Sequence, residues 1–488
     1  MSISDKLLET DDEKTLDISL YDTDEEKEKK KFTDHSALVT FLLLCIGPLA
    51  ILASAGVDAV DQIIVSKGLK NIQPDVTTII GFASMPLTVL TAFGNIFGQA
   101  LTVYLSKLLG EGSRTAAAYL ANDAIRIAIL ASIPFAIIYN FLIKPFLRFC
   151  NCPSQYVQDA YNYLLPLVIL NPFVTVITVE VNFLQSIGRS GLSGLFKIAA
   201  CCLATLVFTP ILVFAFKATS KYLKLATGLS EVIISILLFI LIYSGKFSLK
   251  LNFRMLIEKP HKEILKALVL SLPIVLQLLN IILPPSIVIK SLAKVDAEHS
   301  DLVGSAFSSF NRVNSILLAL VGLFTAGFMS AATHAFGSKN YKRMFQLLGW
   351  ALLFSFVCVT IVSAIVVFGP GVINGMFLNT KEEIDYANRM LPVPFYTYLL
   401  NGLSMPLGVF LIVIGKPVFS IIGIALQMIL ICVGADLLAR FQNDAIVVMH
   451  AYNISNVVMF LVFASSFLFY FCRMKKNNQV LTDESQNI

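Results

Sequence analysis

Residues 37 to 56 read Ala37-Leu-Val-Thr-Phe-Leu-Leu-Leu-Cys-Ile-Gly-Pro-Leu-Ala-Ile-Leu-Ala-Ser-Ala-Gly56, a run of 20 residues without a charged side chain. A helix needs about 20 predominantly apolar residues to cross the hydrocarbon of a bilayer. Backbone groups in hydrocarbon must pair within their own segment, and a run this long does so as a helix rather than as a barrel strand. The stretch therefore predicts a membrane-spanning helix.

Apolar runs of this kind recur along the whole chain. They are 37–66, 76–104, 118–142, 160–187, 193–216, 225–244, 263–290, 302–330, 345–368, 388–414, 417–439 and 445–472. Of the 488 residues, 56% are hydrophobic and only 14% are charged, against about 25% charged in soluble domains. This composition excludes a soluble enzyme, a disordered protein and an ordinary nucleic-acid binder, and it predicts an all-α membrane protein with twelve transmembrane helices.

The runs fall into two related halves. Three pairs of features recur at nearly one spacing: Gly110-Glu-Gly-Ser-Arg114 with Gly337-Ser-Lys-Asn-Tyr341 (227 apart), Gly188-Arg189 with Gly415-Lys416 (227 apart), and Pro48 with Pro273 (225 apart). Each half has an even number of spans, so both halves enter the membrane in the same direction. We therefore expect two six-helix bundles related by a pseudo-two-fold axis along the membrane normal, with a cleft between them.

Charge and polarity divide the chain further. Residues 1–35 form a polar, acidic segment that we expect to be a disordered cytosolic tail. We expect an N-terminal lobe at 36–244, a cytosolic linker at 245–262, a C-terminal lobe at 263–472 and a cytosolic tail at 473–488. The even-numbered connections and both tails carry twenty Lys and Arg near the spans, the odd-numbered connections twelve. Both termini are therefore predicted to be cytosolic.

Two acids follow the first apolar run. Asp58 and Asp61 are three residues apart, which on a helix places them on one face, about 5–6 Å from each other. Like charges at that distance titrate as a pair and could pass a proton from one side to the other. Alternatively the helix ends near Gly56 and both acids lie among the headgroups. Hydropathy does not choose between the two.

Other polar residues lie deeper in the spans. Glu180 stands midway along its run, where an acid is costly, and we interpret it as functional. Glu231 and Asp436 are better explained structurally, Asp436 by an ion pair with Arg440 four residues on. Gln277 and Asn280 stand between Pro273 and Pro284-Pro285; they either line a cavity or hold helices together.

The sequence contains no pattern for a metal, a nucleotide or a disulfide framework. Six of the eight cysteines lie inside apolar runs, where cysteine acts as a small hydrophobic residue. The five histidines are scattered, and no phosphate-binding glycine loop is present. We therefore expect neither metal nor cofactor. The expected partners are small organic substrates and the bilayer, not nucleic acid, and we expect a monomer.

Taken together, the features resemble the multidrug and toxic compound extrusion (MATE) family. Four stretches carry the resemblance: Asp61-Gln-Ile-Ile-Val-Ser-Lys-Gly68, Gly110-Glu-Gly-Ser-Arg114, Asn182-Phe-Leu-Gln-Ser-Ile-Gly-Arg189 and Ala335-Phe-Gly-Ser-Lys-Asn-Tyr-Lys-Arg343. The first resembles the family's first-helix Asp motif, and the second and fourth resemble its two loop motifs. The similarity extends from about residue 36 to 472.

The resemblance implies a secondary antiporter that exports organic, often cationic, compounds in exchange for H⁺ or Na⁺. It gives Asp61 the coupling role, with Asp58 or Glu180 as its partner. One branch of the family has Asn and Asp where this chain has Thr205 and Thr209, and other branches have Glu where it has Gln277. The implied substrate-binding candidates are Gln277, Asn280, Thr205, Thr209 and Asp436.

One alternative has the same architecture: a flippase for a lipid-linked or amphipathic substrate, which cationic side chains along the cleft would favour. A channel would need a filter-like repeat or a ring of charges, and a membrane-embedded enzyme would need a cluster of His, Asp and Glu; neither pattern is present. The sequence leaves open whether the protein lies in the plasma membrane or in an internal membrane such as that of a vacuole.

Overall fold

The structure is a computed structural model that describes residues 32–69, 72–73, 75–150, 152–217, 219–256, 259–260, 263–296, 299–378, 380–441 and 444–486. Within these ranges all regular secondary structure is helical. The predicted tail at 1–35 lies almost entirely outside the described residues, and so do some side chains inside helices, among them that of Asp58.

Ten helical segments are long and apolar enough to cross a membrane, and two bent pairs bring the number to as many as twelve. The first six spans are α2 (Ala37–Gly68), α3 (Val76–Gly110), α4 (Arg114–Phe149), α5 (Ser154–Ile169) with α6 (Asn171–Ser186), α7 (Ser190–Cys202) with the π-helical turns η2 (Leu203–Phe208) and η3 (Ile211–Ala215), and α8 (Ser220–Tyr243). The predicted all-α, twelve-span architecture is confirmed.

The last six spans repeat this order. They are α9 (Glu263–Val295), α10 (Ser300–Gly337), α11 (Tyr341–Phe368), α13 (Lys381–Met390) and α14 (Pro392–Phe395) with α15 (Leu399–Val413), α16 (Pro417–Phe441), and α17 (Ala445–Val448) with α18 (His450–Gln486). Two short helices lie outside the spans: η4 (Phe253–Leu256) and α12 (Pro370–Phe377). The fourth span bends by 58° and the tenth by 43°. The bend of the fourth span lies beside Pro172 and that of the tenth follows Pro394, and a proline lacks the N–H that would continue the helix.

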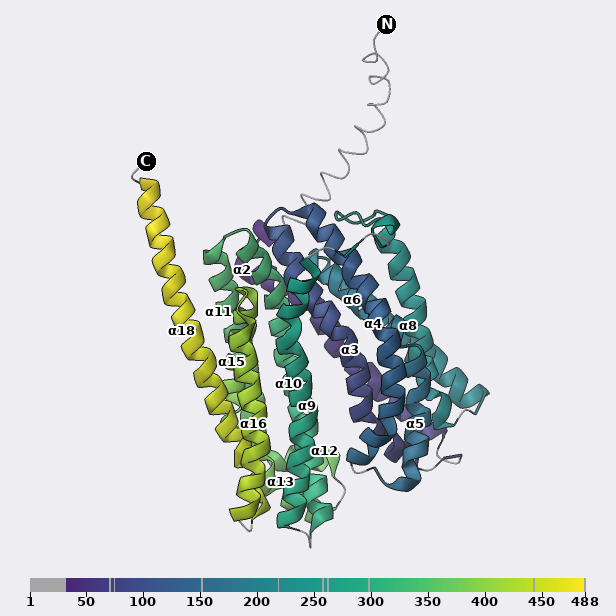
Figure 1. Ribbon diagram of the computed structural model, residues 1–488. Coiled ribbons are helices and arrows are strands. Elements are labelled where there is room, and N and C mark those ends of the chain that lie inside the picture. Colours follow the sequence, from purple (N-terminus) through teal and green to yellow (C-terminus); the bar gives the residue numbers. More distant parts are fainter. Residues whose placement is uncertain are drawn as a thin grey trace.

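The helix pairing has two-fold symmetry. Helix α2 packs on α7 as α9 packs on α16, and α3 packs on α6 as α10 packs on α15. Between the halves, α2 meets α10 and α9 meets α3. We call α2–α8 the N-lobe and α9–α18 the C-lobe; they lie side by side in Figure 1. One end of the bundle, which we call the terminal face, contains the end of α18 and the connections 111–113, 187–189, 338–340 and 414–416. We call the other end the distal face.

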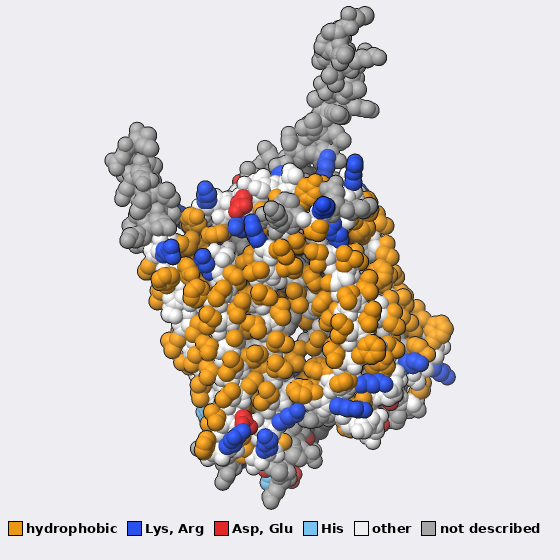
Figure 2. Space-filling model, in the orientation of Figure 1, with side chains coloured by type: hydrophobic (Ala, Val, Ile, Leu, Met, Phe, Trp, Pro, Cys, Tyr) orange, Lys and Arg blue, Asp and Glu red, His pale blue; other side chains and the backbone are white. Residues whose placement is uncertain are grey.

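A belt of hydrophobic side chains covers the face of the molecule that Figure 2 shows. Figure 2 shows this belt between groups of Lys and Arg at both ends. Large apolar side chains in the belt face outward, among them Ile138, Phe141 and Leu195. Such a surface suits hydrocarbon rather than water. The protein is therefore an integral, multi-pass membrane protein.

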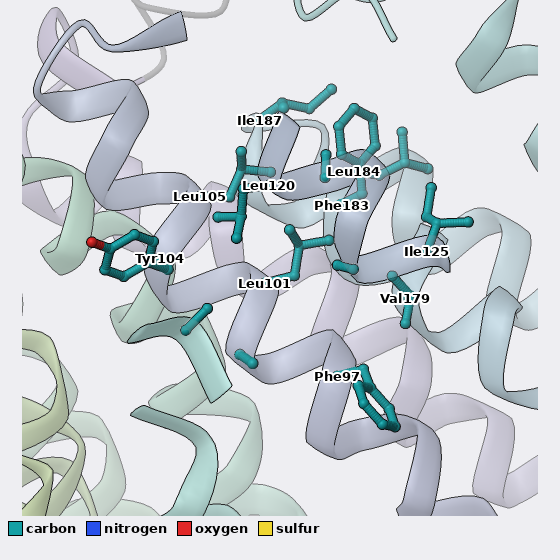
Figure 3. Packing of buried hydrophobic residues seen from close by; sticks show 14 of the residues in the cluster. Phe97, Leu101, Tyr104, Leu105, Leu120, Ile125, Val179, Phe183, Leu184 and Ile187 are labelled. Carbon is teal, nitrogen blue, oxygen red and sulfur yellow. The ribbon is translucent and has the colours of Figure 1, made fainter. Parts of the chain in front are cut away.

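Each lobe has one apolar core toward each face. In the N-lobe, Phe97, Leu101 and Leu105 of α3 pack near Phe183 and Leu184 of α6 on the terminal side (Figure 3). A second core lies toward the distal face, built from α2, α3, α4 and α5. The C-lobe repeats this arrangement. Because close packing holds helices together in hydrocarbon, the two cores fix the positions of the polar side chains that lie between them.

The lobes meet backbone to backbone at the terminal face. A Cβ on Gly110 would lie 2.2 Å from the His334 carbonyl oxygen, and a Cβ on Gly337 would lie 2.3 Å from the Lys107 carbonyl oxygen. These are the two glycines that the sequence pairs at a spacing of 227. Phe32 is buried there as well, its ring stacked on His334 with centroids 4.4 Å apart. Only residues without a side chain permit this approach, so the repeated glycines allow the two lobes to meet at the terminal face.

Candidate functional site

Asp61 makes a hydrogen bond between the first and fifth spans. The Thr209 hydroxyl donates to Asp61 Oδ1 over 2.6 Å. Thr209 is 2% exposed, and Asp61 stands seven residues before the end of α2, which is about 10 Å of helix. The structure thus brings two of the predicted residues into direct contact.

The fifth span changes its winding at this contact. Thr209 lies between the π-helical turns η2 and η3, and Pro210 follows it. Proline donates no backbone hydrogen bond, and π-helical turns occur mostly as interruptions of α-helices, often at functional sites. The altered winding places the Thr209 hydroxyl against α2, at a point where the backbone is not held by regular α-helical hydrogen bonds.

Helix α2 is fastened to α7 on the terminal side as well. Pro48 lacks the N–H that would bond the Leu44 carbonyl, and the Ser190 hydroxyl donates to that carbonyl over 2.7 Å. The Gly47 N–H in turn donates to Ser190 Oγ over 3.0 Å. A neighbouring serine thus satisfies the backbone groups that the proline disturbs, as occurs in membrane helices. Further along, the Cys201 thiol donates to the Ser54 carbonyl.

The helix continues past both acids. Since α2 runs from Ala37 to Gly68, the helix does not end near Gly56, and Asp58 and Asp61 both belong to it. Whether the two acids lie within the membrane or among the headgroups stays a prediction. The side chain of Asp58 lies outside the described residues. Whether the two carboxylates interact therefore stays a prediction.

Glu180 is fully buried on α6 but is not near Asp61. Its Oε2 accepts a hydrogen bond of 3.1 Å from the Ser235 hydroxyl of α8, and its Oε1 has no partner. Glu180 lies six residues from the terminal end of α6, whereas Thr209 lies 19 residues beyond the start of α7 at that same face. At 1.5 Å per residue the two carboxylates stand roughly 20 Å apart along the bundle axis. The expectation that Glu180 partners Asp61 is therefore wrong.

A polar cavity of about 310 Å³ lies inside the N-lobe, between its two apolar cores. Among the described lining residues the charged ones are Lys197 of α7 and Lys224 and Glu231 of α8. Lys197 Nζ lies 3.2 Å from Glu231 Oε1, and Lys224 Nζ lies 5.6 Å from the centre of the Tyr163 ring. The uncharged polar lining includes Thr91, Asn95, Thr178 and Asn182.

One face of α8 connects this cavity with Glu180. Lys224, Thr227, Glu231 and Ser235 follow each other at intervals of three or four residues, so their side chains share a face. The first three line the cavity and the fourth donates to Glu180. The stripe extends for about 16 Å at 1.5 Å per residue. Glu231 has the predicted structural role, in an ion pair with Lys197, and the same ion pair also forms part of the cavity wall.

Three charged residues of the N-lobe were not among the predicted ones. Lys197 lies inside the predicted span 193–216, and a lysine within an apolar helix is as unusual as a carboxylate. The sequence therefore contained a signal by which Lys197 could have been predicted as a candidate. Lys224 lies one residue before the predicted span 225–244 and so counted as a loop residue. The third, Asp123, is buried within the predicted span 118–142, where it pairs with Arg126.

The two inner cavities of the C-lobe have no charged residue among their described linings. Amides converge there: Asn280 Nδ2 donates to Gln427 Oε1 over 2.7 Å, and Asn401 Nδ2 donates to Asn456 Oδ1 over 3.1 Å. Gln277 lies between a cavity of about 230 Å³ and a smaller one beside this network. Gln277 and Asn280 thus line a cavity, and Asn280 also links two helices.

The remaining two candidates lie apart from these linings. Thr205 is buried in η2, one turn before Thr209. Asp436 stands near the distal end of α16, where its Oδ2 lies 2.6 Å from Arg440 Nη2 and its Oδ1 lies 3.7 Å from Lys294 Nζ. The expected i,i+4 ion pair of Asp436 is confirmed, and its partners are exposed side chains. Among the described residues no three His, Cys, Asp or Glu gather as metal ligands would.

Two helical lobes of six spans each, with an inner cavity in either lobe and contact at one face, have the architecture of a membrane transporter. Residues 49–211 and 297–425 match the family described as MatE. The chain belongs to this family of multidrug and toxic compound extrusion proteins, and it is accordingly a transporter rather than an enzyme.

The chain is also similar in sequence to individual proteins that are named as multidrug exporters. The chain is 24% identical over 325 residues to the multidrug export protein MepA of Staphylococcus aureus strain MSSA476, covering 65% of this chain and 68% of that protein. It is also 24% identical over 322 residues to MepA of Staphylococcus haemolyticus, with the same coverage.

Solved structures share the fold. A MOP superfamily transporter from Pyrococcus furiosus superimposes with a TM-score of 0.80 at 16% identity, over 91% of this chain and 97% of that one. A MATE family transporter in an outward-facing conformation superimposes with a TM-score of 0.79 at 17% identity, over 92% of this chain and 98% of that one.

Proposed function

We propose that the protein is a secondary antiporter that exports small organic compounds in exchange for H⁺ or Na⁺ by alternating access. Its relatives named as multidrug export proteins support export of organic molecules. The observation that carries the coupling part is the Asp61 carboxylate, which accepts a hydrogen bond from buried Thr209 at a π-helical interruption.

The coupling ion acts through this contact. An ionised Asp61 accepts the Thr209 hydroxyl proton strongly, since hydrogen bonds to charged groups are about twice as strong as neutral ones. A proton or a Na⁺ ion at the carboxylate competes for the same oxygen and weakens the link between α2 and the fifth span. Helix α2 also packs on α10 of the other lobe, so a shift of α2 changes the contact between the lobes.

Exchange then requires that the two arrangements of the lobes bind the ion and the substrate with different affinity. The close approach of Gly110 to the His334 carbonyl and of Gly337 to the Lys107 carbonyl belongs to one arrangement of the lobes, and transport requires their separation. We place the terminal face in the cytosol, because the connections and tails on that side carry more Lys and Arg. The described arrangement is then closed toward the cytosol, as one half of an alternating cycle requires.

Reconstituted vesicles test this function. The protein is reconstituted into vesicles and a pH gradient or a Na⁺ gradient is imposed across their membrane. Export of a panel of small organic compounds is then measured. We expect one gradient to drive transport and Asp61→Asn to abolish the driven component while the protein stays folded by size-exclusion chromatography. Transport that neither gradient affects would contradict antiport and would point to a facilitator or a flippase.

A further inference from the structure

We propose that residues 32–36, which precede α2, form a strap that joins the two lobes at the terminal face and has to release before that face opens. The strap begins at Phe32 and ends at Ser36, the N-cap of α2. It controls access to the interior from the terminal side, so the inference rests on the proposed transport function and adds its regulation. Two anchors hold the strap: the Phe32 ring and the Arg343 guanidinium.

The first anchor is the Phe32 ring, which lies between the two lobes. It is stacked on His334 of α10, with ring centroids 4.4 Å apart and planes inclined by 8°. On the N-lobe side, a Cβ on Gly188 would lie 2.8 Å from Phe32 Cε2. Gly188 connects α6 with α7 and has a φ of +81°, a conformation that glycine adopts without strain. Because Phe32 is only 5% exposed, one buried ring contacts both lobes.

The second anchor is Arg343, in the first turn of α11 in the C-lobe. Its Nη1 donates to the Thr33 carbonyl over 3.2 Å, and its Nη2 donates to the His35 carbonyl over 2.9 Å. Nη2 also donates to the Thr40 hydroxyl, at the start of α2, over 2.8 Å. Hydrogen bonds from a charged donor are stronger than neutral ones. Arg343 therefore ties the backbone of the strap and the first turn of α2 to the C-lobe.

The strap can release without unfolding the helix that follows it. Phe32 is buried, whereas the next four residues are exposed. Helix α2 has its own start, because the Val39 N–H donates to the Ser36 hydroxyl oxygen over 3.3 Å, and such an N-cap satisfies a backbone donor of the first turn. Withdrawal of one ring and one guanidinium is therefore sufficient to free the strap while α2 stays intact.

The internal duplication shows that the fold does not require this contact. At the spacing of 227, Phe32 corresponds to Lys259, which is exposed, and Gly188 corresponds to Gly415. A Cβ on Gly415 would meet no described atom within 4 Å. The second half thus forms the same turn without an aromatic ring against it. The strap is an addition to the duplicated framework, as a regulatory element would be.

The strap favours the arrangement in which the terminal face is closed. Separation of the lobes there moves Gly188 away from His334 and Arg343 away from Thr40, so both anchors are lost. An interaction that is present in only one of two arrangements shifts the population toward that arrangement. An aromatic contact of this kind changes such a ratio about two- to tenfold. We therefore expect loss of the Phe32 ring to raise the open fraction by that factor.

Amide hydrogen exchange of the purified full chain in detergent tests the strap, because exchange reports how often a segment opens. The two terminal connections, 111–113 in the N-lobe and 338–340 in the C-lobe, are compared by mass spectrometry. We expect Phe32→Ala to speed exchange in both connections about two- to tenfold. Exchange at Gly369, after α11, should stay unchanged, which separates opening of one face from general loosening.

Two further variants assign the effect to the strap. The matched control is Phe253→Ala: this ring is 56% exposed and contacts Phe239 and Tyr243, both of α8, so it does not join the lobes. It should leave exchange in the terminal connections unchanged. Arg343→Gln should act in the same direction as Phe32→Ala. Because the two anchors hold one segment, the combined variant should speed exchange by less than the product of the two single effects.

Three results would overturn the inference: unchanged exchange in both connections of Phe32→Ala, faster exchange confined to 338–340, which would indicate local loosening of the C-lobe, or an equal increase in Phe253→Ala. Gradient-driven, Asp61-dependent export together with unchanged exchange in Phe32→Ala would refute the strap and leave the antiporter function standing. Faster exchange in both connections of Phe32→Ala, without gradient-driven transport by the unaltered protein, would refute antiport and leave the strap standing.

Discussion

The cavities of the two lobes occupy equivalent positions but differ in polarity. Lys197 of the N-lobe wall corresponds to Ile424 of the C-lobe wall, and Thr178 corresponds to Met405, in both cases 227 residues further along the chain. The backbone around them is alike, since the same helices pair and the fourth span of each half bends. The duplication has kept the helix framework and has let the side chains inside it diverge.

This difference indicates a division of tasks. The N-lobe contains the ion pair, the buried Glu180 and the Asp61–Thr209 contact. In the C-lobe interior amide side chains bond to one another, and amides carry no charge to move or neutralise. We therefore propose that ion coupling belongs to the N-lobe and that the C-lobe provides a neutral counterpart against which it moves. Four substitutions test this division.

The largest effect is expected from Lys197→Gln. It leaves Glu231, which is largely buried, without its cationic partner. Removing one member of a buried ion pair is strongly destabilising, and we expect a loss of about 3 kcal/mol in the free energy of unfolding. Thermal unfolding in detergent measures it. The double variant Lys197→Gln with Glu231→Gln should recover most of the stability, and an equal loss in both variants would argue against the pair.

A smaller effect is expected from Thr209→Val, which keeps the shape of the side chain and removes the hydroxyl that donates to Asp61. A hydrogen bond to a charged group contributes about 1.5–3 kcal/mol, so the initial rate of gradient-driven export should fall about tenfold. The control is Asp436→Asn, at the corresponding place in the C-lobe. It breaks only an ion pair with exposed partners, worth less than about 1 kcal/mol, and the rate should be almost unchanged.

Within the C-lobe, Gln427→Leu should change stability without changing coupling. It removes the acceptor of Asn280 and leaves that amide short of a partner, at a cost of about 1 kcal/mol. The expected result is a slightly lower unfolding temperature with the same dependence of export on the imposed gradient. A change in which gradient drives export would show that the amide network takes part in coupling.

The smallest effect concerns the distal edge of the C-lobe. A hydrogen bond from His299, together with one from the Tyr386 hydroxyl, holds the pKa of Asp296 below its ordinary value of 3.8. Because this pKa is lowered on folding, ionised Asp296 stabilises the fold above pH about 4 and loses this contribution as the pH falls through the lowered pKa. Asp296→Asn should therefore cost stability at pH 7 and less at pH 3. Thermal unfolding at both values checks this, and an equal cost at both would refute it.

Hydropathy alone was sufficient to predict the twelve-span helical architecture. Hydrocarbon forces every span to be a long apolar helix. The twelve apolar runs and their division into two halves can therefore be recognised in the sequence. The repeated glycines at 110 and 337 indicated a duplication, and the structure adds that each lies against the backbone of the other lobe, at His334 and at Lys107. Asp61 was also predictable, because a carboxylate in an apolar run is rarely there for solubility.

The partners of these residues were not predictable. Whether Thr209 faces Asp61 depends on the π-helical winding of the fifth span, which turns side chains away from their α-helical positions. The contact of Glu180 with Ser235 instead of Asp61 depends on the height of each residue in the bundle. The role of Lys197 was not predictable either, because its charge becomes meaningful only once Glu231 is known to face it.

The central claim is that the coupling ion is handled in the N-lobe, at Asp61. Its most direct test is the flux of the coupling ion itself, measured with an internal pH dye or with radioactive Na⁺ during export by vesicles that carry Asp61→Asn or, in parallel, Gln277→Leu. The account predicts that Asp61→Asn abolishes the ion flux that accompanies export and that Gln277→Leu preserves it. Preserved ion flux in Asp61→Asn, with loss in Gln277→Leu, would place coupling in the C-lobe and contradict the account.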